Sequence, residues 1–156
     1  MINVSIVCIG KLKEGYLREA SAEYAKRLGR FCRFSVRELP EKQIEGKSEA
    51  DIAAVKRAEG ERIVGAVKGH VIALDGRGKQ ISSEELADLL KKKAQTSSEI
   101  DFVIGGSYGL SDEVRARADE VISFGRITFP HQLIRIVAQE QIYRAFTINA
   151  GITYHK

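Results

Sequence analysis

Residues 70–94 read HVIALDGRGKQISSEELADLLKKKA, and this stretch decides the fold. His70–Asp75 is a nearly continuous apolar run, which is typical of a central strand in a parallel sheet that is buried on both faces. Gly76–Lys79 is predicted to be a loop. Ser82 with Glu85 has the spacing of a capping box and predicts a helix that runs to about Ala94. A strand, a loop and a helix in this order form the repeating unit of an α/β protein.

The same alternation extends in both directions along the chain. We expect four further strands. Three of them span Ile2–Ile9, Phe31–Leu39 and Val121–Phe124, and another ends with Phe102–Ile104. We expect four further helices, at Glu14–Leu28, from Ser48 to about Val67, a short one from Ser111, and from Pro130 to about Asn149. This order favours a parallel sheet covered by helices on both faces. Because no linker, repeat or low-complexity tract interrupts the chain, residues 1–156 are expected to form a single domain.

The composition is that of an ordinary globular domain. Of the 156 residues, 44% are hydrophobic and 29% are charged, which excludes intrinsic disorder, a collagen-like fibre and a disulfide-framework miniprotein. No apolar run is long enough for a membrane span and no signal peptide is recognisable, so we expect a cytoplasmic protein with no membrane contact. The net charge of +4 is mildly basic, and basic residues gather between positions 11 and 37. Solvated helix faces and contacts with nucleic-acid phosphates both explain that cluster.

Cysteine and histidine give no metal or redox motif. Cys8 and Cys32 lie far apart in apolar, strand-like runs, so both are expected to be buried as small hydrophobic side chains. The three histidines, His70, His131 and His155, show no metal-ligand spacing, so no metal is expected.

Three glycine-containing loops follow predicted strands: Asp75–Lys79, Gly105–Gly109 and Gly125–Phe129. Parallel sheets bind ligands beyond the carboxyl ends of their strands, and glycine lets a ligand approach the backbone. The GGSYG loop is not a P-loop, lacks the features of a dinucleotide fingerprint, and is also compatible with ordinary turn glycines. No nucleophile elbow or carboxylate dyad is present. These residues favour chemistry that relies on positioning around a pre-activated cofactor, and methyl transfer from S-adenosylmethionine fits that description.

The C-terminal segment carries a dense set of polar groups. His131 and Arg135 are four residues apart and are predicted to share one helix face next to a loop, an arrangement suited to an anion. Glu140 and Arg144 have the same spacing, for which a weak surface ion pair is the simpler interpretation. The final residues, Tyr154–Lys156, offer a ring, an imidazole and a cation, which are the residue types that hold an RNA base and its phosphate. A frayed tail is the alternative.

Several motifs together resemble the family of bacterial ribosomal large-subunit methyltransferase H, a minimal SPOUT class. They are Leu74-Asp75 with Gly78-Lys79, Ile104–Ser111, Thr128–His131 with Arg135, Glu140-Gln141 with Tyr143–Ala145, and Tyr154–Lys156. The resemblance extends over the whole chain in length and motif order, and no motif position departs from the family pattern.

This resemblance implies a SPOUT fold whose C-terminal part forms a deep trefoil knot, and a homodimer. It implies that S-adenosylmethionine donates a methyl group to N3 of a pseudouridine in 23S rRNA on the assembled 70S ribosome. The residues that it assigns to the cofactor are Leu74, Gly105, Phe124, Gly125, Arg126, Ile127, Thr128 and Phe129.

For the transfer itself, His155 is the hypothetical general base, with Tyr154 stacking on the base or orienting it. Arg135 and His131 would stabilise the developing anion or hold a phosphate. Arg144 and Lys156 are assigned to RNA or to the dimer contact. Other functions stay open: a SPOUT enzyme that acts on tRNA, a non-catalytic ribosome-binding factor, and a small nucleotide-binding regulator supported only by the GGSYG loop.

Overall fold

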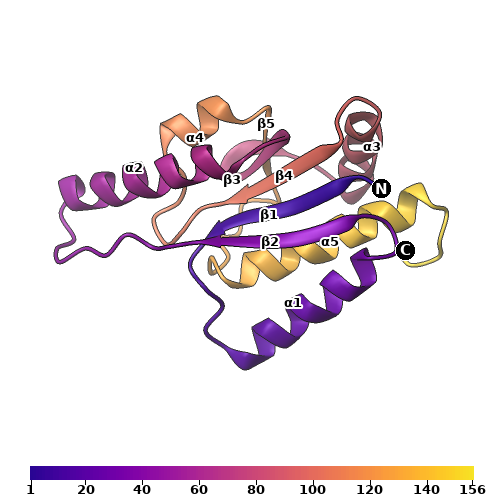
Figure 1. The fold of residues 1–156 in the computed structure, drawn as a ribbon, viewed down its shortest axis with the longest axis horizontal. Helices are drawn as coiled ribbons and strands as arrows, with labels where there is room; N and C mark the ends of the chain where they lie inside the picture. The colour runs from indigo at the N-terminus through magenta and orange to yellow at the C-terminus, as the bar shows by residue number, and fades with distance from the viewer.

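Five parallel strands form one sheet in the order β2-β1-β4-β3-β5 in the computed structural model, which describes residues 1–156 (Figure 1). The strands are β1 (Asn3–Ile9), β2 (Arg33–Leu39), β3 (His70–Gln80), β4 (Glu99–Ile104) and β5 (Glu120–Ser123). The helices are α1 (Gly15–Leu28), α2 (Glu49–Ala66), α3 (Ser83–Ala94), α4 (Asp112–Arg117) and α5 (Leu133–Asn149). The predicted order of strands and helices and the parallel sheet are therefore confirmed.

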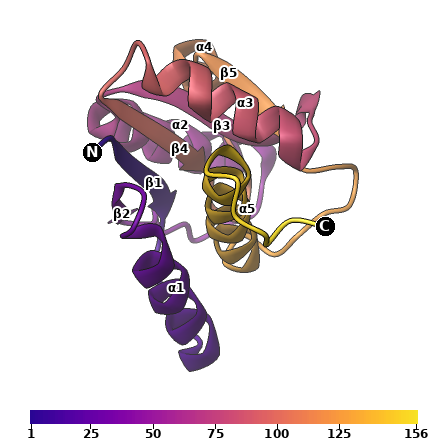
Figure 2. The ribbon, with the colours of Figure 1, turned by 90° about the vertical axis from the view of Figure 1, so that its right-hand side faces the viewer.

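Helices cover both faces of the sheet, as Figures 1 and 2 show. On one face, Val4 and Ile6 of β1 pack in a core with residues of α1, α3 and α5. On the other face, Val7 and Ile9 pack with residues of α2 and α4. Successive side chains of a strand point to opposite faces, so a strand buried on both sides must be apolar at nearly every position. None of the helices is long and apolar enough to cross a membrane.

The helix starts read from the sequence are confirmed by their caps. Ser48 and Asp51 form a reciprocal capping box at the start of α2, and Ser82 and Glu85 form another at the start of α3. The Ser111 hydroxyl accepts a hydrogen bond from Val114 N–H and caps α4. Each side-chain cap satisfies a backbone donor that the helix leaves unpaired, a contribution of about 1 kcal/mol.

Both cysteines are buried and free, as the sequence indicated. Burial raises the pKa of Cys8 to about 11 and that of Cys32 to about 12, so both thiols stay protonated at neutral pH. Cys32 lies just before β2 rather than inside it.

Most boundaries agree with the prediction to within two residues, and two differ more. Gly76–Lys79 is not simply a loop, because β3 continues to Gln80 after a register shift in which Leu74 and Lys79 both pair with Ile122. The intervening residues bulge from the sheet. The last helix begins at Leu133 instead of Pro130: Ile134 N–H already donates to the Pro130 carbonyl, but the preceding residues form a turn.

A buried carboxylate joins three strands to the loop between α2 and β3. Asp101 is fully buried in β4 and accepts hydrogen bonds from Ser5 of β1 and, at 2.6 Å, from Arg37 of β2. Its other oxygen accepts from the backbone N–H groups of Lys68 and Gly69 at 2.6 and 3.0 Å. Burial by itself raises the pKa of Asp101, but these hydrogen bonds and the Arg37 charge together hold it below 3.8.

We predict that Asp101→Ala destabilises the fold by about 3–5 kcal/mol at neutral pH, because it removes the buried ion-pair partner of Arg37 and leaves two backbone donors unpaired. Because its folded-state pKa is lowered, the contribution of Asp101 is complete above its unfolded-state pKa and is lost as the pH falls through the folded-state value. Urea unfolding at pH 7 and in acid measures both effects. A loss below 1 kcal/mol at pH 7 would contradict this role.

Candidate functional site

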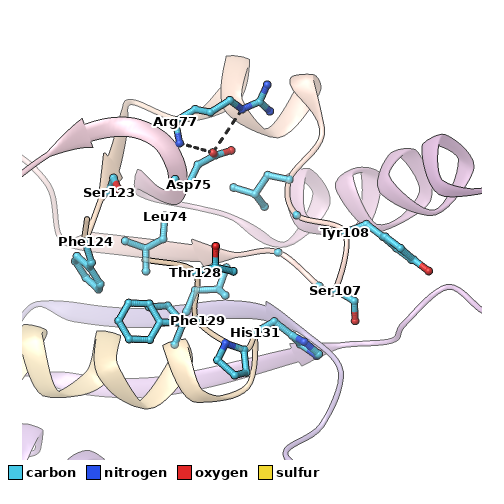
Figure 3. Close-up of a pocket in the computed structure, with 18 of the residues that line it drawn as sticks. Leu74, Asp75, Arg77, Ser107, Tyr108, Ser123, Phe124, Thr128, Phe129 and His131 are labelled. Atoms are coloured by element: carbon cyan, nitrogen blue, oxygen red, sulfur yellow. Dashed lines mark hydrogen bonds and ion pairs between the residues drawn. The ribbon is translucent and has the colours of Figure 1, made fainter. Parts of the chain in front are cut away.

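A cavity of about 580 Å³ opens beyond the carboxyl ends of β3, β4 and β5 (Figure 3). The three loops singled out in the sequence meet there, as expected for a parallel sheet. All eight residues expected to hold a cofactor line this one cavity: Leu74, Gly105, Phe124, Gly125, Arg126, Ile127, Thr128 and Phe129. The structure thus brings together residues that lie up to 55 positions apart in the chain.

The loop after β4 is folded tightly on itself. Gly109 N–H donates to the Gly106 carbonyl at 3.0 Å, and Gly109 has a φ of +84°, which favours glycine. A Cβ on Gly105 would lie 2.7 Å from the carbonyl carbon of Gly109, so no larger residue fits without a shift of the loop. The cavity therefore has a wall of bare backbone at this point.

The loop after β5 forms the opposite wall. The Ser123 hydroxyl accepts from Gly125 N–H at 3.1 Å and donates to the Gly125 carbonyl at 2.9 Å, which fixes the turn, and Gly125 has a φ of +125°. In Figure 3, Phe124 and Phe129 lie on the same side of the cavity as Leu74 and provide apolar surface next to the polar backbone. Such a mixture of apolar lining and a few polar groups is typical of small-molecule sites.

Asp75 lines the cavity, but its carboxylate is already bound. One oxygen accepts from Arg115 of α4 at 2.9 Å and the other from Arg77 N–H at 2.9 Å. Burial alone raises the pKa of Asp75, and these hydrogen bonds and charges lower it below 3.8 overall. Asp75 is therefore ionised at neutral pH and links β3 to α4 at the edge of the cavity.

His131 is the one member of the predicted catalytic set that lines the cavity. Burial lowers the pKa of its imidazole below 6.5, the charges of Arg135 and Lys13 lower it further, and Glu41 opposes them. The ring is therefore neutral at pH 7 and has a nitrogen free to accept a proton.

Arg135 does not line the cavity. This corrects the expectation that its guanidinium faces a bound anion. Its side chain is only 1% exposed and makes an ion pair of 2.8 Å with Glu38. It also donates to the carbonyls of Gly10 and Ile9 at 3.1 and 3.3 Å. Since the helix starts later than predicted and Arg135 turns toward the end of β1, its guanidinium ties α5 to the sheet in place of contacting a ligand.

The C-terminal residues fold back along α5 and are not frayed. Tyr154 meets the Tyr143 ring edge-on at 4.9 Å and lies under the Arg144 guanidinium, also at 4.9 Å. His155 contacts Arg144 through Nδ1 at 3.1 Å and Glu84 of α3 through Nε2 at 2.6 Å. Glu140 and Arg144 pair as predicted, at 2.8 Å, but both are half-buried. Lys156 is exposed.

None of these C-terminal residues lines the cavity of its own chain. Arg144 lies 11 residues beyond the start of α5, which corresponds to about 16 Å along the helix axis. Within one chain, the predicted catalytic residues thus lie in three places: His131 at the cavity, Arg135 buried against the ends of β1 and β2, and Tyr154 with His155 farther along α5.

The comparison with known proteins decides the family. The family model described as "Predicted SPOUT methyltransferase" matches residues 2–155. The chain belongs to the SPOUT methyltransferase family. Its expected identity as a methyltransferase enzyme is thereby confirmed.

Relatives similar to this SPOUT methyltransferase are named "Ribosomal RNA large subunit methyltransferase H". The protein from Pediococcus pentosaceus is 52% identical, that from Ligilactobacillus salivarius 54% and that from Clostridium novyi 51%, each over 99% of this chain and 100% of the relative. Among solved structures, a probable methylase family protein from Haemophilus influenzae is similar in fold, with a TM-score of 0.56 at 16% identity. That match covers 99% of this chain and 71% of the other.

Sequence reasoning missed two charged residues at the cavity. Arg115 reaches it from α4 and Lys56 from the middle of α2. Neither has a local signal, because a lysine or arginine on an amphipathic helix normally indicates a solvated face. Only the packing of α2 and α4 against the same face of the sheet brings these side chains to the cavity.

We predict that Gly105→Ala weakens S-adenosylmethionine binding at least tenfold, because the new methyl group displaces Gly109 and the loop backbone. Gly76→Ala is the matched control: Gly76 also lines the cavity, but a Cβ there has no atom within 4 Å and no left-handed backbone to strain. Titration calorimetry measures both variants. Equal affinities for the two would show that the tight Gly105–Gly109 turn does not shape the binding site.

Proposed function

We propose that this protein transfers a methyl group from S-adenosylmethionine to N3 of a pseudouridine in 23S rRNA, acting in the cytoplasm on the assembled 70S ribosome. The observation that carries the proposal is the convergence of three strand-end loops on one cavity, in a chain about half identical to methyltransferases named for large-subunit rRNA. None of the relatives described above is named as a tRNA enzyme or as a non-catalytic factor. The three loops that line the cavity are intact, which argues against a degenerate cofactor site.

The residues at the cavity fit S-adenosylmethionine. The apolar side chains of Leu74, Phe124 and Phe129 suit an adenine ring, while the exposed backbone of the Gly105 and Gly125 loops suits the polar groups of a nucleoside and an amino acid. When bound, this cofactor supplies an electrophilic methyl group on a sulfonium that is its own leaving group. The protein then has to orient the two reactants and remove one proton.

The proton to be removed is on N3 of the target base. His131 is suited to accept it, because its imidazole is neutral at pH 7 and lines the cavity. The Tyr154 and His155 pair of the same chain is held against α5 and α3, so we propose that it acts on the cavity of a second copy of the chain. There Tyr154 would stack on the base, and His155 would orient it or share the proton.

A homodimer is consistent with the surface of α1 and α5. An aromatic cluster of Tyr24, Phe31, Tyr143 and Phe146 joins the two helices, with the Phe31 and Phe146 rings stacked at 5.7 Å. Contiguous partly exposed aromatic surface of this kind is characteristic of subunit contacts. We propose that a second copy covers this cluster and contacts Arg144 and Lys156.

The chain path supports the proposed trefoil knot. The chain leaves β5 at one edge of the sheet, yet α5 packs between α3 and α1 against the central strands. To reach that place, residues 124–132 have to cross beyond the carboxyl ends of β3 and β4. The Gly105–Gly109 loop, which follows β4, lies at the same carboxyl end of the sheet. We infer that the C-terminal part passes through a loop of the preceding chain.

The proposed reaction predicts label in 23S rRNA when the enzyme meets labelled S-adenosylmethionine and ribosomes that lack the modification. Assembled ribosomes, separate subunits, protein-free rRNA and tRNA are compared as acceptors. One small domain offers little area for sequence readout, so assembled ribosomes are expected to be the best acceptor. Label in tRNA alone would mean that the substrate is tRNA, and ribosome binding without any label would favour the non-catalytic factor.

We predict that the single-turnover rate falls in acid with a midpoint below 6.5, the ordinary histidine value, because burial and the neighbouring positive charges lower the pKa of His131. His131→Ala should reduce the rate by about 10²–10⁴ and abolish the fall in acid. A fall centred above pH 6.5, or one that persists in His131→Ala, would exclude His131 as the proton acceptor.

A further inference from the structure

The cavity is lined by more positive charge than its cofactor needs. Lys56, Arg77, Arg115 and Arg126 all line it, and Asp75 is the only carboxylate among the lining residues. Arg115 is neutralised locally, because it donates to Asp75 at 2.9 Å and to the Leu110 carbonyl at 2.8 Å. Of the other three cations, Arg77 has one long contact with Asp75, at 3.7 Å, and Lys56 and Arg126 make no ion pair. The charges of Lys56 and Arg77 also lower the pKa of Asp112 at the start of α4. S-adenosylmethionine carries a sulfonium and an ammonium against one carboxylate, so this excess charge does not complement it.

Three of these lining cations are available to a ligand. Lys56 and Arg126 make no ion pair and no side-chain hydrogen bond. Arg77 has only a 3.7 Å contact with Asp75, and its side chain is 69% exposed. They come from α2, from the bulge of β3 and from the loop after β5, so together they border the cavity on different sides.

A fourth cation lies next to the cavity on the loop between β1 and α1. Lys13 N–H donates to the Gln132 side chain at 3.1 Å, directly after cavity-lining His131. Its charge lies near enough to His131 to help lower the pKa of that imidazole. Lys13 is exposed and makes no ion pair of its own. We call Lys13, Lys56, Arg77 and Arg126 the rim cations.

The arginines of the basic 11–37 segment are mostly engaged elsewhere. Arg27 pairs with Glu23 at 2.7 Å and lies over the rings of Tyr24 and Tyr143. Arg37 is bound to Asp101 in the sheet, and Arg18 donates to backbone carbonyls of its own loop. Arg144 is likewise held between Glu140 and Tyr154. Free positive charge therefore lies around the cavity more than on α1.

We propose that the rim cations form the docking surface for the RNA backbone, holding the phosphates on either side of the target nucleotide while its base enters the cavity. This rests on the proposed rRNA methyl transfer. The chemistry is that of phosphate recognition, because cations from separate elements border a cavity of nucleotide size. Lys13, Arg77 and Arg126 are exposed and Lys56 is partly exposed, and only Arg77 has an acidic contact, at 3.7 Å. An acidic protein surface would also meet cations, but a nucleotide must enter this cavity, and its flanking phosphates then lie at the rim.

The test compares two triple variants with the same loss of charge. Lys13→Gln/Lys56→Gln/Arg77→Gln removes three rim cations and leaves Arg126, whose backbone lines the cofactor site. Arg33→Gln/Lys68→Gln/Lys91→Gln removes three exposed cations that make no ion pair and lie toward the amino-terminal edge of the sheet or on α3. Affinity for unmodified ribosomes and for a protein-free 23S rRNA fragment is measured from 50 to about 300 mM KCl, and S-adenosylmethionine affinity by calorimetry.

The rim variant is expected to bind both RNA ligands at least tenfold more weakly, with the slope of log K against log salt reduced by about 2–3, and to keep its cofactor affinity within twofold. The control variant should resemble the wild type. Wild-type affinity and slope in the rim variant, or an equal loss in the control, would overturn the proposal. Loss of ribosome binding with unchanged binding to protein-free RNA would overturn it too, in favour of an acidic protein partner. Failure of the wild type to methylate any RNA would instead count against the proposed function.

Discussion

A buried guanidinium fixes the position of the last helix. Arg135 on the first turn of α5 pairs with Glu38 at the end of β2 and donates to the carbonyls of Ile9, the last residue of β1, and of Gly10 after it. Removal of Glu38 would leave the fully buried guanidinium without its carboxylate, whereas Glu38 itself is one-third exposed and reaches solvent. The Arg135 Nε atom has no acceptor, so this position is held despite an unpaired polar atom. A second polar contact, between Gln139 and Ser21, ties α5 to α1 farther along.

This anchor determines the geometry of the cavity. The 124–132 segment spans from β5, at the sheet edge, to a helix start fixed beside β1 and β2. It must therefore cross the carboxyl ends of the intervening strands, where it faces the Gly105–Gly109 loop and the end of β3. The walls of the site are mostly backbone, and a backbone that must lie close to a ligand depends on the elements that hold each end of the loop. Arg135 thus acts on the site by positioning it.

Much of this arrangement could be predicted from the sequence. The strands are apolar runs, the capping boxes at Ser48 and Ser82 mark helix starts, and the rule for parallel sheets brings three glycine loops to one edge. The direction of Arg135 could not be predicted, because a spacing of four residues says that two side chains share a face but not which neighbour covers it. The bulge in β3 is set by its partner β5, and Glu84, which contacts His155, lies 71 positions before it in the chain. Contacts of this kind depend on tertiary packing, which local sequence patterns do not determine.

The central claim is that the cavity of one chain works with Tyr154 and His155 of another. Mixed dimers test it directly. Gly105→Ala chains, with a damaged cavity and an intact C-terminus, are refolded with His155→Ala chains, in which the cavity is intact. Each variant alone should methylate ribosomes poorly. Random exchange makes half of the dimers mixed, each with one complete site, so about a quarter of the wild-type activity should return. No recovery on mixing would contradict the account, because it would mean that each cavity depends on the C-terminus of its own chain.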